Sequence, residues 1–288
     1  MEPRGAFLAC LLLLLVAGFG CADIAQSREL EIRDDQPLHL PQIGATGLRI
    51  ISPTVLELTL ITSKAADSSR LSEWDFVQDN AFHPPPVTEI EVTAANRKIR
   101  IKELGFKRRP LYAPLKERDL RIANHLYLQL SEPVQDGITV EVKNPNGRLW
   151  KDKKFTAVAH PFRWSPVLHV NQEGYVPAFP KSAMVGYYLG SSGELEISDG
   201  TEFHLLEARS EKKVFSGRLQ LRRDVGYNPP AYQSVYEANF SEFQRPGEYQ
   251  LFVPGLGTSY PFFINDGIAA SFARAYALGL YHQRCGAA

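Results

Sequence analysis

The chain has 288 residues, 44% of them hydrophobic, which is enough for about two domains with packed cores. It carries 32 Lys+Arg and 32 Asp+Glu and has no net charge, which argues against nucleic acid or an anionic membrane surface as its main partner. The three cysteines exclude a disulfide framework, and none is spaced with a histidine as in a zinc site, so we expect neither metal nor cofactor.

Residues 1–22 have the pattern of a secretory signal peptide. Arg4 precedes an apolar run from Phe7 to Val16, which is too short for a membrane span and is followed by small residues. Ordinary cleavage at Gly20-Cys21-Ala22 and a lipobox-like reading of Gly18-Phe19-Gly20-Cys21 both fit. We therefore expect an exported bacterial protein, secreted, periplasmic or anchored to the outer membrane, with Cys21 as a possible lipid-attachment site.

A polar linker over residues 23–41 leads into two strand-rich regions, 42–162 and 163–266. The first region has short alternating or β-branched runs bounded by turn signals. Its expected strands are Leu48–Ile51, Val55–Thr62, Val87–Thr93, Lys98–Lys102, Ile122–Leu130, Gly137–Lys143 and Lys154–Ala159. The second has the strand spacing of an immunoglobulin-like sandwich without the Cys…Trp…Cys signature. Its expected strands are Val167–Val170, Ser182–Leu189, Glu194–Ile197, Glu202–Leu206, Lys213–Gly217, Tyr232–Phe240, Gly247–Val253 and Ser259–Ile264.

Residues 267–288 have the pattern of an amphipathic helix. Ile268, Phe272, Tyr276 and Leu280 recur every four residues, which places them on one face. Such a face needs a partner, and the sequence up to Ala288 offers no second helix to cover it. The predicted fold class is therefore all-β, with two β-sandwich domains followed by a truncated helix, and we expect the helix to open a further domain.

The sequence marks no catalytic residue. Glu57, Glu89 and Glu91 lie in strand patterns and are expected on solvent faces, and Asp75 and Asp79 lie in a loop-like stretch. Glycoside hydrolysis needs two carboxyl groups held across a cleft, and no such pair stands out. Two histidines, His125 and His169, alternate with apolar residues, so packing in or near a core is the favoured interpretation.

Four aromatic residues could instead form a sugar-stacking platform, namely Trp74, Phe76, Trp150 and Trp164. Core and linker packing is the favoured alternative for them. Two charged stretches, 107–109 and 116–119, are mixed in sign and are expected to form a solvated loop face rather than an anion site.

Three separated segments resemble the family nine glycoside hydrolases. The run Asn171-Gln-Glu-Gly-Tyr-Val-Pro177 is similar to the opening Asn-Gln-x-Gly-Tyr-x-Pro strand of that family's N-terminal immunoglobulin-like domain. Phe240-Ser-Glu-Phe243 with Pro246-Gly-Glu-Tyr249 resembles the domain's late turn and strand. Tyr281-His-Gln-Arg-Cys-Gly286 resembles the first helix of the family's catalytic (α/α)₆ barrel. The resemblance covers about residues 163–288.

The resemblance implies a non-catalytic N-terminal region of an exported enzyme that inverts at the anomeric carbon of a β-1,4-glucan. The family's catalytic Asp pair and Glu general acid belong to stretches beyond Ala288, so no catalytic residue transfers and the chain alone should hydrolyse no β-glucan. The expected partner is a β-glucan polysaccharide bound through the catalytic domain, with no nucleic acid and a possible lipid anchor. The alternative is a surface adhesion or carbohydrate-binding lipoprotein without hydrolase activity.

Overall fold

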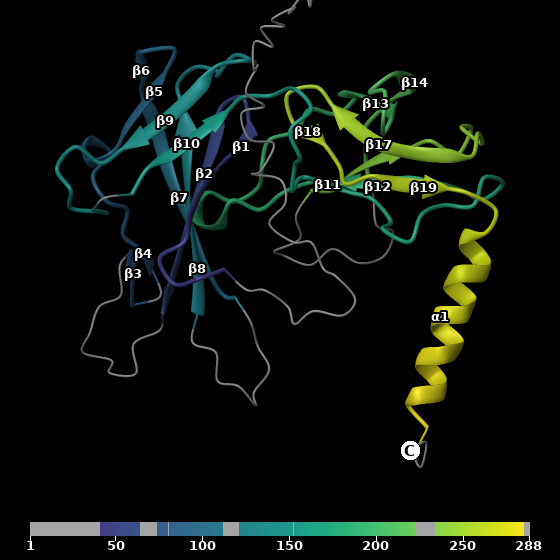
Figure 1. The fold of residues 1–288 in the computed structure, drawn as a ribbon. Coiled ribbons are helices and arrows are strands. Elements are labelled where there is room, and N and C mark those ends of the chain that lie inside the picture. Colours follow the sequence, from purple (N-terminus) through teal and green to yellow (C-terminus); the bar gives the residue numbers. More distant parts are fainter. Residues whose placement is uncertain are drawn as a thin grey trace, which may run out of the picture. The chain divides into compact units, whose positions relative to one another are not determined.

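The computed structural model describes residues 41–63, 74–79, 81–111, 121–151, 153–222 and 234–284. These residues belong to one compact unit, His39–Ala288 (Figure 1). The predicted signal peptide, Cys21 and nearly all of the predicted linker lie outside the described residues. Among the described residues, no helix has the length and apolarity needed to cross a membrane.

The first sandwich consists of two four-stranded antiparallel sheets. One sheet has the order β1-β2-β8-β7, formed by β1 (Thr46–Ser52), β2 (Val55–Ser63), β8 (Arg121–Leu130) and β7 (Ile101–Pro110). The other has the order β10-β9-β5-β6, formed by β10 (Phe155–Val158), β9 (Thr139–Lys143), β5 (Glu91–Ala94) and β6 (Arg97–Ile99). A small hairpin, β3 (Val77–Gln78) with β4 (Ala81–Phe82), and the 3₁₀ turn η2 (Val87–Glu89) complete it.

Alternation along the strands builds the first core. Leu58 of β2 and its cross-strand neighbour Leu126 of β8 are fully buried and share a cluster with Val92 and Val142 of the opposite sheet. Trp74 joins the same core, where its ring lies 6.1 Å from that of Phe155. Burial of such side chains contributes about 1.5–3 kcal/mol each, and residues 42–162 contain no cysteine that could add a disulfide.

The second sandwich also has two antiparallel sheets. The smaller has the order β11-β12-β16-β15, formed by β11 (Leu168–His169), β12 (Ser182–Val185), β16 (Tyr236–Asn239) and β15 (Gln220–Leu221). The larger has the order β14-β13-β17-β18, with β19 also paired to β17; its strands are β14 (Lys213–Arg218), β13 (Glu202–Glu207), β17 (Gly247–Val253), β18 (Gly257–Thr258) and β19 (Phe262–Ile264). Val185 and Ala238 of one sheet pack with Leu205 and Leu251 of the other.

The chain then forms helix α1 (Ile268–His282), which extends away from the second sandwich (Figure 1). Every helical residue after Ile268 is exposed, including Tyr276 at 62%, whose ring stacks on that of Phe272 at 6.0 Å. The predictions of an all-β fold and of a terminal amphipathic helix are confirmed.

Several predictions of strands and loops were wrong in part. Residues 87–89 form η2 instead of a strand, following three consecutive prolines that donate no backbone hydrogen bonds. The basic stretch 107–109 lies in β7 and pairs with β8, where a loop was expected. Residues 194–197 form only the isolated bridge of Glu194 with Tyr188. Residues 116–119 lie outside the described part of the chain.

Candidate functional site

The outer face of the β1-β2-β8-β7 sheet carries a polar cluster against the second sandwich. The strand register places Arg49, Glu57, Tyr127 and Gly105 opposite one another across the four strands. The next row places His125 between Thr59 and Lys107. Side chains opposed on one face of an antiparallel sheet lie about 4.5–5.5 Å apart at Cβ, so the register alone gathers these groups.

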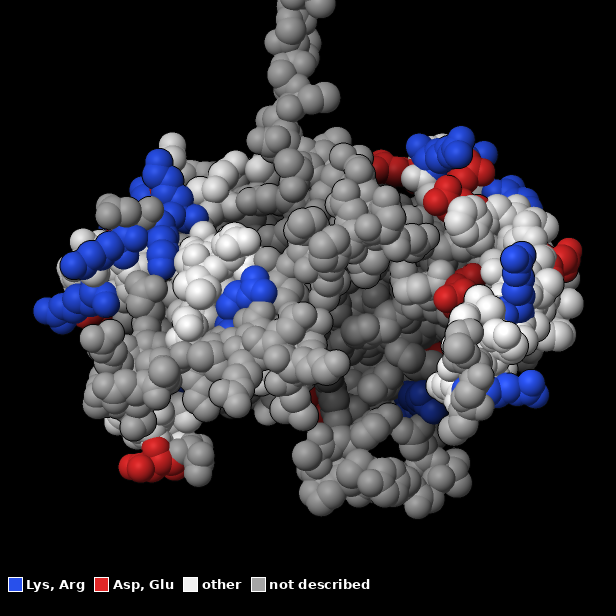
Figure 2. Space-filling view, turned by 60° about the horizontal axis from the view of Figure 1, so that its bottom comes forward, with Lys and Arg blue, Asp and Glu red and all other residues white. Residues whose placement is uncertain are grey.

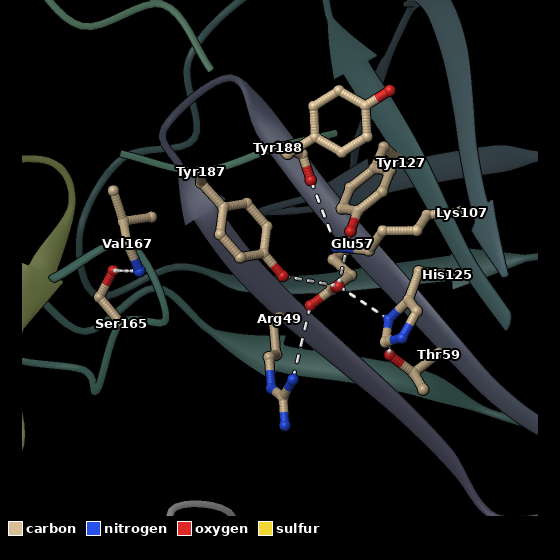
Figure 3. A network of polar contacts seen from close by, with 10 residues as sticks. All are labelled: Arg49, Glu57, Thr59, Lys107, His125, Tyr127, Ser165, Val167, Tyr187 and Tyr188. Atoms are coloured by element: carbon tan, nitrogen blue, oxygen red, sulfur yellow. Dashed lines mark hydrogen bonds and ion pairs between the residues drawn. The ribbon is translucent and has the colours of Figure 1, made fainter. Parts of the chain in front are cut away.

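Glu57 is the centre of this cluster and is fully buried. Its Oε1 accepts hydrogen bonds from the hydroxyls of Tyr127 and Tyr187, both at 3.1 Å, and lies 2.9 Å from Nδ1 of His125 (Figure 3). Its Oε2 lies 3.6 Å from a guanidinium nitrogen of Arg49. Since Tyr187 belongs to the second sandwich, the carboxylate joins the two sandwiches.

Lys107 lies over the same two tyrosine rings. Its Nζ is 5.5 Å from the ring centre of Tyr127 and 4.9 Å from that of Tyr187, and it donates to the carbonyl oxygen of Tyr188 at 3.3 Å. Figure 3 shows the side chains of Lys107, Tyr127 and Tyr187 directed toward Glu57. The cluster thus includes basic groups from three strands around one carboxylate.

The electrostatics keep Glu57 ionised. Burial by itself would raise the pKa of Glu57, but the hydrogen bond from His125 and the charges of His125, Arg49 and Lys107 outweigh it and lower the pKa from 4.5 to about 2. Burial, reinforced by the Glu57 carboxylate, raises the pKa of both Tyr127 and Tyr187, so their hydroxyls remain neutral donors. A carboxylate held in this state is a poor proton donor, and the cluster functions as a structural joint.

The expectation that Glu57 and Glu89 face solvent was wrong. Glu57 is covered by the second sandwich, and Glu89 is 94% buried beside Arg148, which lies 2.9 Å away. Strand alternation shows only which face points away from a strand's own core. It does not show whether another domain covers that face. Alternation therefore could not identify Glu57 as part of the site.

A glycine contact forms the second part of the joint. A Cβ added to Gly105 would lie 2.8 Å from the Leu189 carbonyl oxygen, and one added to Gly190 would lie 2.1 Å from the Phe106 carbonyl oxygen. The backbone amide of Phe106 donates to the hydroxyl of Ser191 at 3.0 Å across this contact. The 3₁₀ turn η3 (Gly190–Ser192) can therefore lie directly on β7 only because both positions lack a side chain.

Arg163, between the two sandwiches in sequence, forms the third part. Its Nε donates to the Ile50 carbonyl oxygen at 2.6 Å, and its Nη2 donates to the Gly255 carbonyl oxygen at 2.6 Å. The next residue, Trp164, is half-buried and lies 5.3 Å beneath the Arg49 guanidinium. The Arg163 guanidinium thereby links the first sandwich to the β17–β18 turn of the second.

The Asn-Gln-x-Gly-Tyr-x-Pro motif forms a separate junction between the second sandwich and α1. The Asn171 side chain donates to the Gly174 carbonyl oxygen at 2.9 Å, and the Tyr175 hydroxyl donates to the Ser182 carbonyl oxygen at 2.9 Å. The Tyr175 backbone bonds to Phe263 and Asn265, immediately before α1. These bonds fix the start of the helix to the sandwich.

Close contacts explain the glycine within this motif, Gly174, and the buried lysine that follows the motif, Lys181. Gly174 has φ +103°, and an added Cβ would lie 2.5 Å from the Phe263 carbonyl oxygen and 2.9 Å from Cδ1 of Ile268. Lys181, 99% buried, donates through Nζ to the carbonyl oxygens of Pro177 at 2.5 Å and Ser241 at 3.1 Å. The first and second sequence motifs are thus linked by this lysine.

The other candidate residues are dispersed. Trp74 and Trp150 are buried in the first core, with Phe76 packed against it, so core packing is confirmed for these three. His125 is buried as expected, whereas His169 is exposed. Asp75 pairs with Arg108 at 3.0 Å. Within the described ranges, no group of three or more metal-ligating side chains is present.

Residues 164–258 match the family model of the cellulase N-terminal Ig-like domain. No curated protein matches the chain. Among solved structures, the chain is similar to a protein named Bacteroides ovatus GH9, with 26% identity over 41% of this chain and 19% of that one, and a TM-score of 0.31. It is also similar to a metagenome-derived glycoside hydrolase family 9 endoglucanase, with 26% identity over 41% of this chain and 21% of that one, and a TM-score of 0.32.

The chain therefore spans about a fifth of the length of these two proteins. The matched segment begins next to Arg163, includes the motif around Tyr175 and ends in β18. The first sandwich and α1 lie outside it.

Proposed function

Because residues 164–258 form a cellulase N-terminal immunoglobulin-like domain, we propose that this glycoside hydrolase-related chain is the non-catalytic N-terminal region of an exported β-glucan hydrolase. Its role is to hold and orient a helical catalytic domain that begins with α1. The observation that carries the proposal is the junction of Tyr175 with residues 263–265, from which an amphipathic helix leaves with its apolar side chains exposed.

The joint around Glu57 supports a positioning role. A module that orients another domain must itself be rigid, and buried hydrogen-bonded charges with close glycine contacts restrict movement between the sandwiches. Hydrolysis would then belong to the catalytic domain, with β-1,4-linked glucan as its substrate.

Export and lipidation are proposed from the sequence of residues 1–22. Labelling with radioactive palmitate in a bacterial host should mark the wild-type chain and not the Cys21→Ala variant. Labelling of neither would support ordinary cleavage and a secreted or periplasmic protein.

The test of the main proposal uses the genomic reading frame beyond Ala288. Expressed with its continuation, the protein should release reducing sugar from soluble β-glucan, while the 288-residue chain should release none. A stop codon after Ala288, together with an isolated chain that is stable and monomeric, would contradict the proposal and favour a carbohydrate-binding lipoprotein.

A further inference from the structure

Two adjoining hollows form a groove at one end of the first sandwich. One, of about 420 Å³, lies against the β9–β10 connection, and the other, of about 400 Å³, lies beside η2, β5 and β6. Pro145 lines both, so the two hollows adjoin at this residue. We call this feature the basic groove.

The groove has a strong excess of positive charge in a chain whose net charge is zero. Its charged lining residues are Lys98, Arg100, Lys143, Lys151, Lys153 and Glu91. At the left of Figure 2, on the first sandwich, Lys and Arg side chains predominate over Asp and Glu. Asp152, between two of these lysines in sequence, lies outside the described residues.

Ion pairs inside the protein use only part of this charge. Lys98 pairs with Glu91 at 2.5 Å, and Lys143 pairs with Glu141 at 2.9 Å. The side chains of Arg100 and Lys151 are exposed, one in each hollow, and have no ion-pair partner among the described residues. Two cations are therefore available to a ligand at separate points along the groove.

The apolar part of the lining favours a polymer of rings over a simple ion. Val87 is 43% exposed and lies in the same hollow as Pro145, so both can pack against the C–H face of a ring. The one aromatic ring among the lining residues, Trp150, is 95% buried and offers no stacking platform of the kind that single-stranded nucleic acids use.

We propose that the basic groove binds an acidic polysaccharide, a chain of sugar rings with carboxylate groups at intervals, such as a uronic-acid polymer. The choice of a glycan over other polyanions rests on the proposed function, which places the protein among polysaccharide-degrading enzymes. The groove would hold the enzyme near mixed plant or microbial glycans, of which the catalytic domain cleaves the neutral component.

The experiment is affinity electrophoresis of the whole chain in native gels containing polygalacturonate. Wild type should be retarded by polygalacturonate and not by the neutral glucan hydroxyethylcellulose, and retardation should weaken as salt rises. Arg100→Gln with Lys151→Gln should weaken binding by about fivefold, since each exposed pair contributes little. The matched control, Arg209→Gln with Lys212→Gln, removes the same charge from exposed positions of the second sandwich and should bind as wild type.

Equal weakening in both double variants, or no retardation of wild type, would overturn the proposal. Tighter binding to a single-stranded oligonucleotide or to phosphatidylglycerol vesicles would also overturn it, because the ligand would then be another polyanion. Binding is measured without hydrolysis. Acidic-polysaccharide binding by the groove can therefore be disproved while the proposed function stands. Conversely, an extended protein that does not hydrolyse β-glucan would leave the result of the binding experiment unchanged.

Discussion

Replacement of Glu57 by Gln should destabilise the protein far more than an ordinary surface change. The substitution keeps the size of the side chain but removes the charge that faces His125, Arg49 and Lys107. If the amide oxygen takes the place of Oε1, which accepts from Tyr127 and Tyr187, the amide NH₂ group faces the Arg49 guanidinium, so that a donor meets a donor.

The magnitude follows from the pKa of Glu57. The difference between the usual value of 4.5 and the folded-state value of about 2 corresponds to about 3 kcal/mol. Removing one partner of a buried ion pair costs a similar amount, roughly 3–5 kcal/mol. Because the folded-state pKa is lowered, this stabilisation is fully present above about pH 4.5 and is lost as the pH falls toward about 2.

Urea unfolding followed by tryptophan fluorescence and circular dichroism measures the effect. We expect Glu57→Gln to lower the free energy of unfolding by about 3 kcal/mol at pH 7 and to weaken the acid sensitivity between pH 4.5 and 2. The control is Glu132→Gln, which removes an exposed ion pair with Arg97 and should cost under about 1 kcal/mol. The reasoning is refuted if the two variants are equally stable.

Three further predictions concern the contacts made by glycines and by α1. Gly105→Ala should cost about 1–3 kcal/mol and slow the re-formation of the joint, whereas Gly47→Ala, where a Cβ meets nothing, should be near neutral in the same urea experiment. Gly174→Ala should be more destabilising than Gly200→Ala, because Gly200 also has a positive φ but has open space where a Cβ would lie. Gly174→Ala should also accelerate amide exchange at Asn265. Equal stability losses in the two variants would show that backbone strain alone matters. Backbone amides of α1 should exchange with solvent faster than those of β13. The double variant Phe272→Ser with Tyr276→Ser should reduce self-association measured by sedimentation, because it removes exposed apolar side chains. Slow exchange of the α1 amides in a monomer would mean that the helix already packs against another part of the chain.

Much of the architecture could be predicted from local patterns. The alternation in Leu56, Leu58 and Leu60 identified a strand and its core face, and the four-residue recurrence from Ile268 identified α1. The Asn171–Pro177 motif indicated an immunoglobulin-like domain, which the family match confirms. These features depend on neighbours in sequence or on a short motif, so the sequence contains them directly.

The structural joint could not be predicted in the same way. Glu57 and Tyr187 are 130 residues apart and meet only when two separately patterned sandwiches pack together. Nothing near Gly105 in the sequence indicates that η3 will lie against it. The same holds for the basic groove, whose cations come from β6, the residue between β6 and β7, β9 and the β9–β10 connection.

By itself, the sequence determined most of the strands, which of their faces point inward and which family the second sandwich resembles, because each of these is set by local periodicity or a contiguous motif. Only the tertiary structure decided that an outward-facing glutamate is buried and ionised, that two glycines permit direct backbone contact, and that the family motif fastens the start of α1. Those outcomes depend on the relative placement of distant strands, and local periodicity carries no information about that placement.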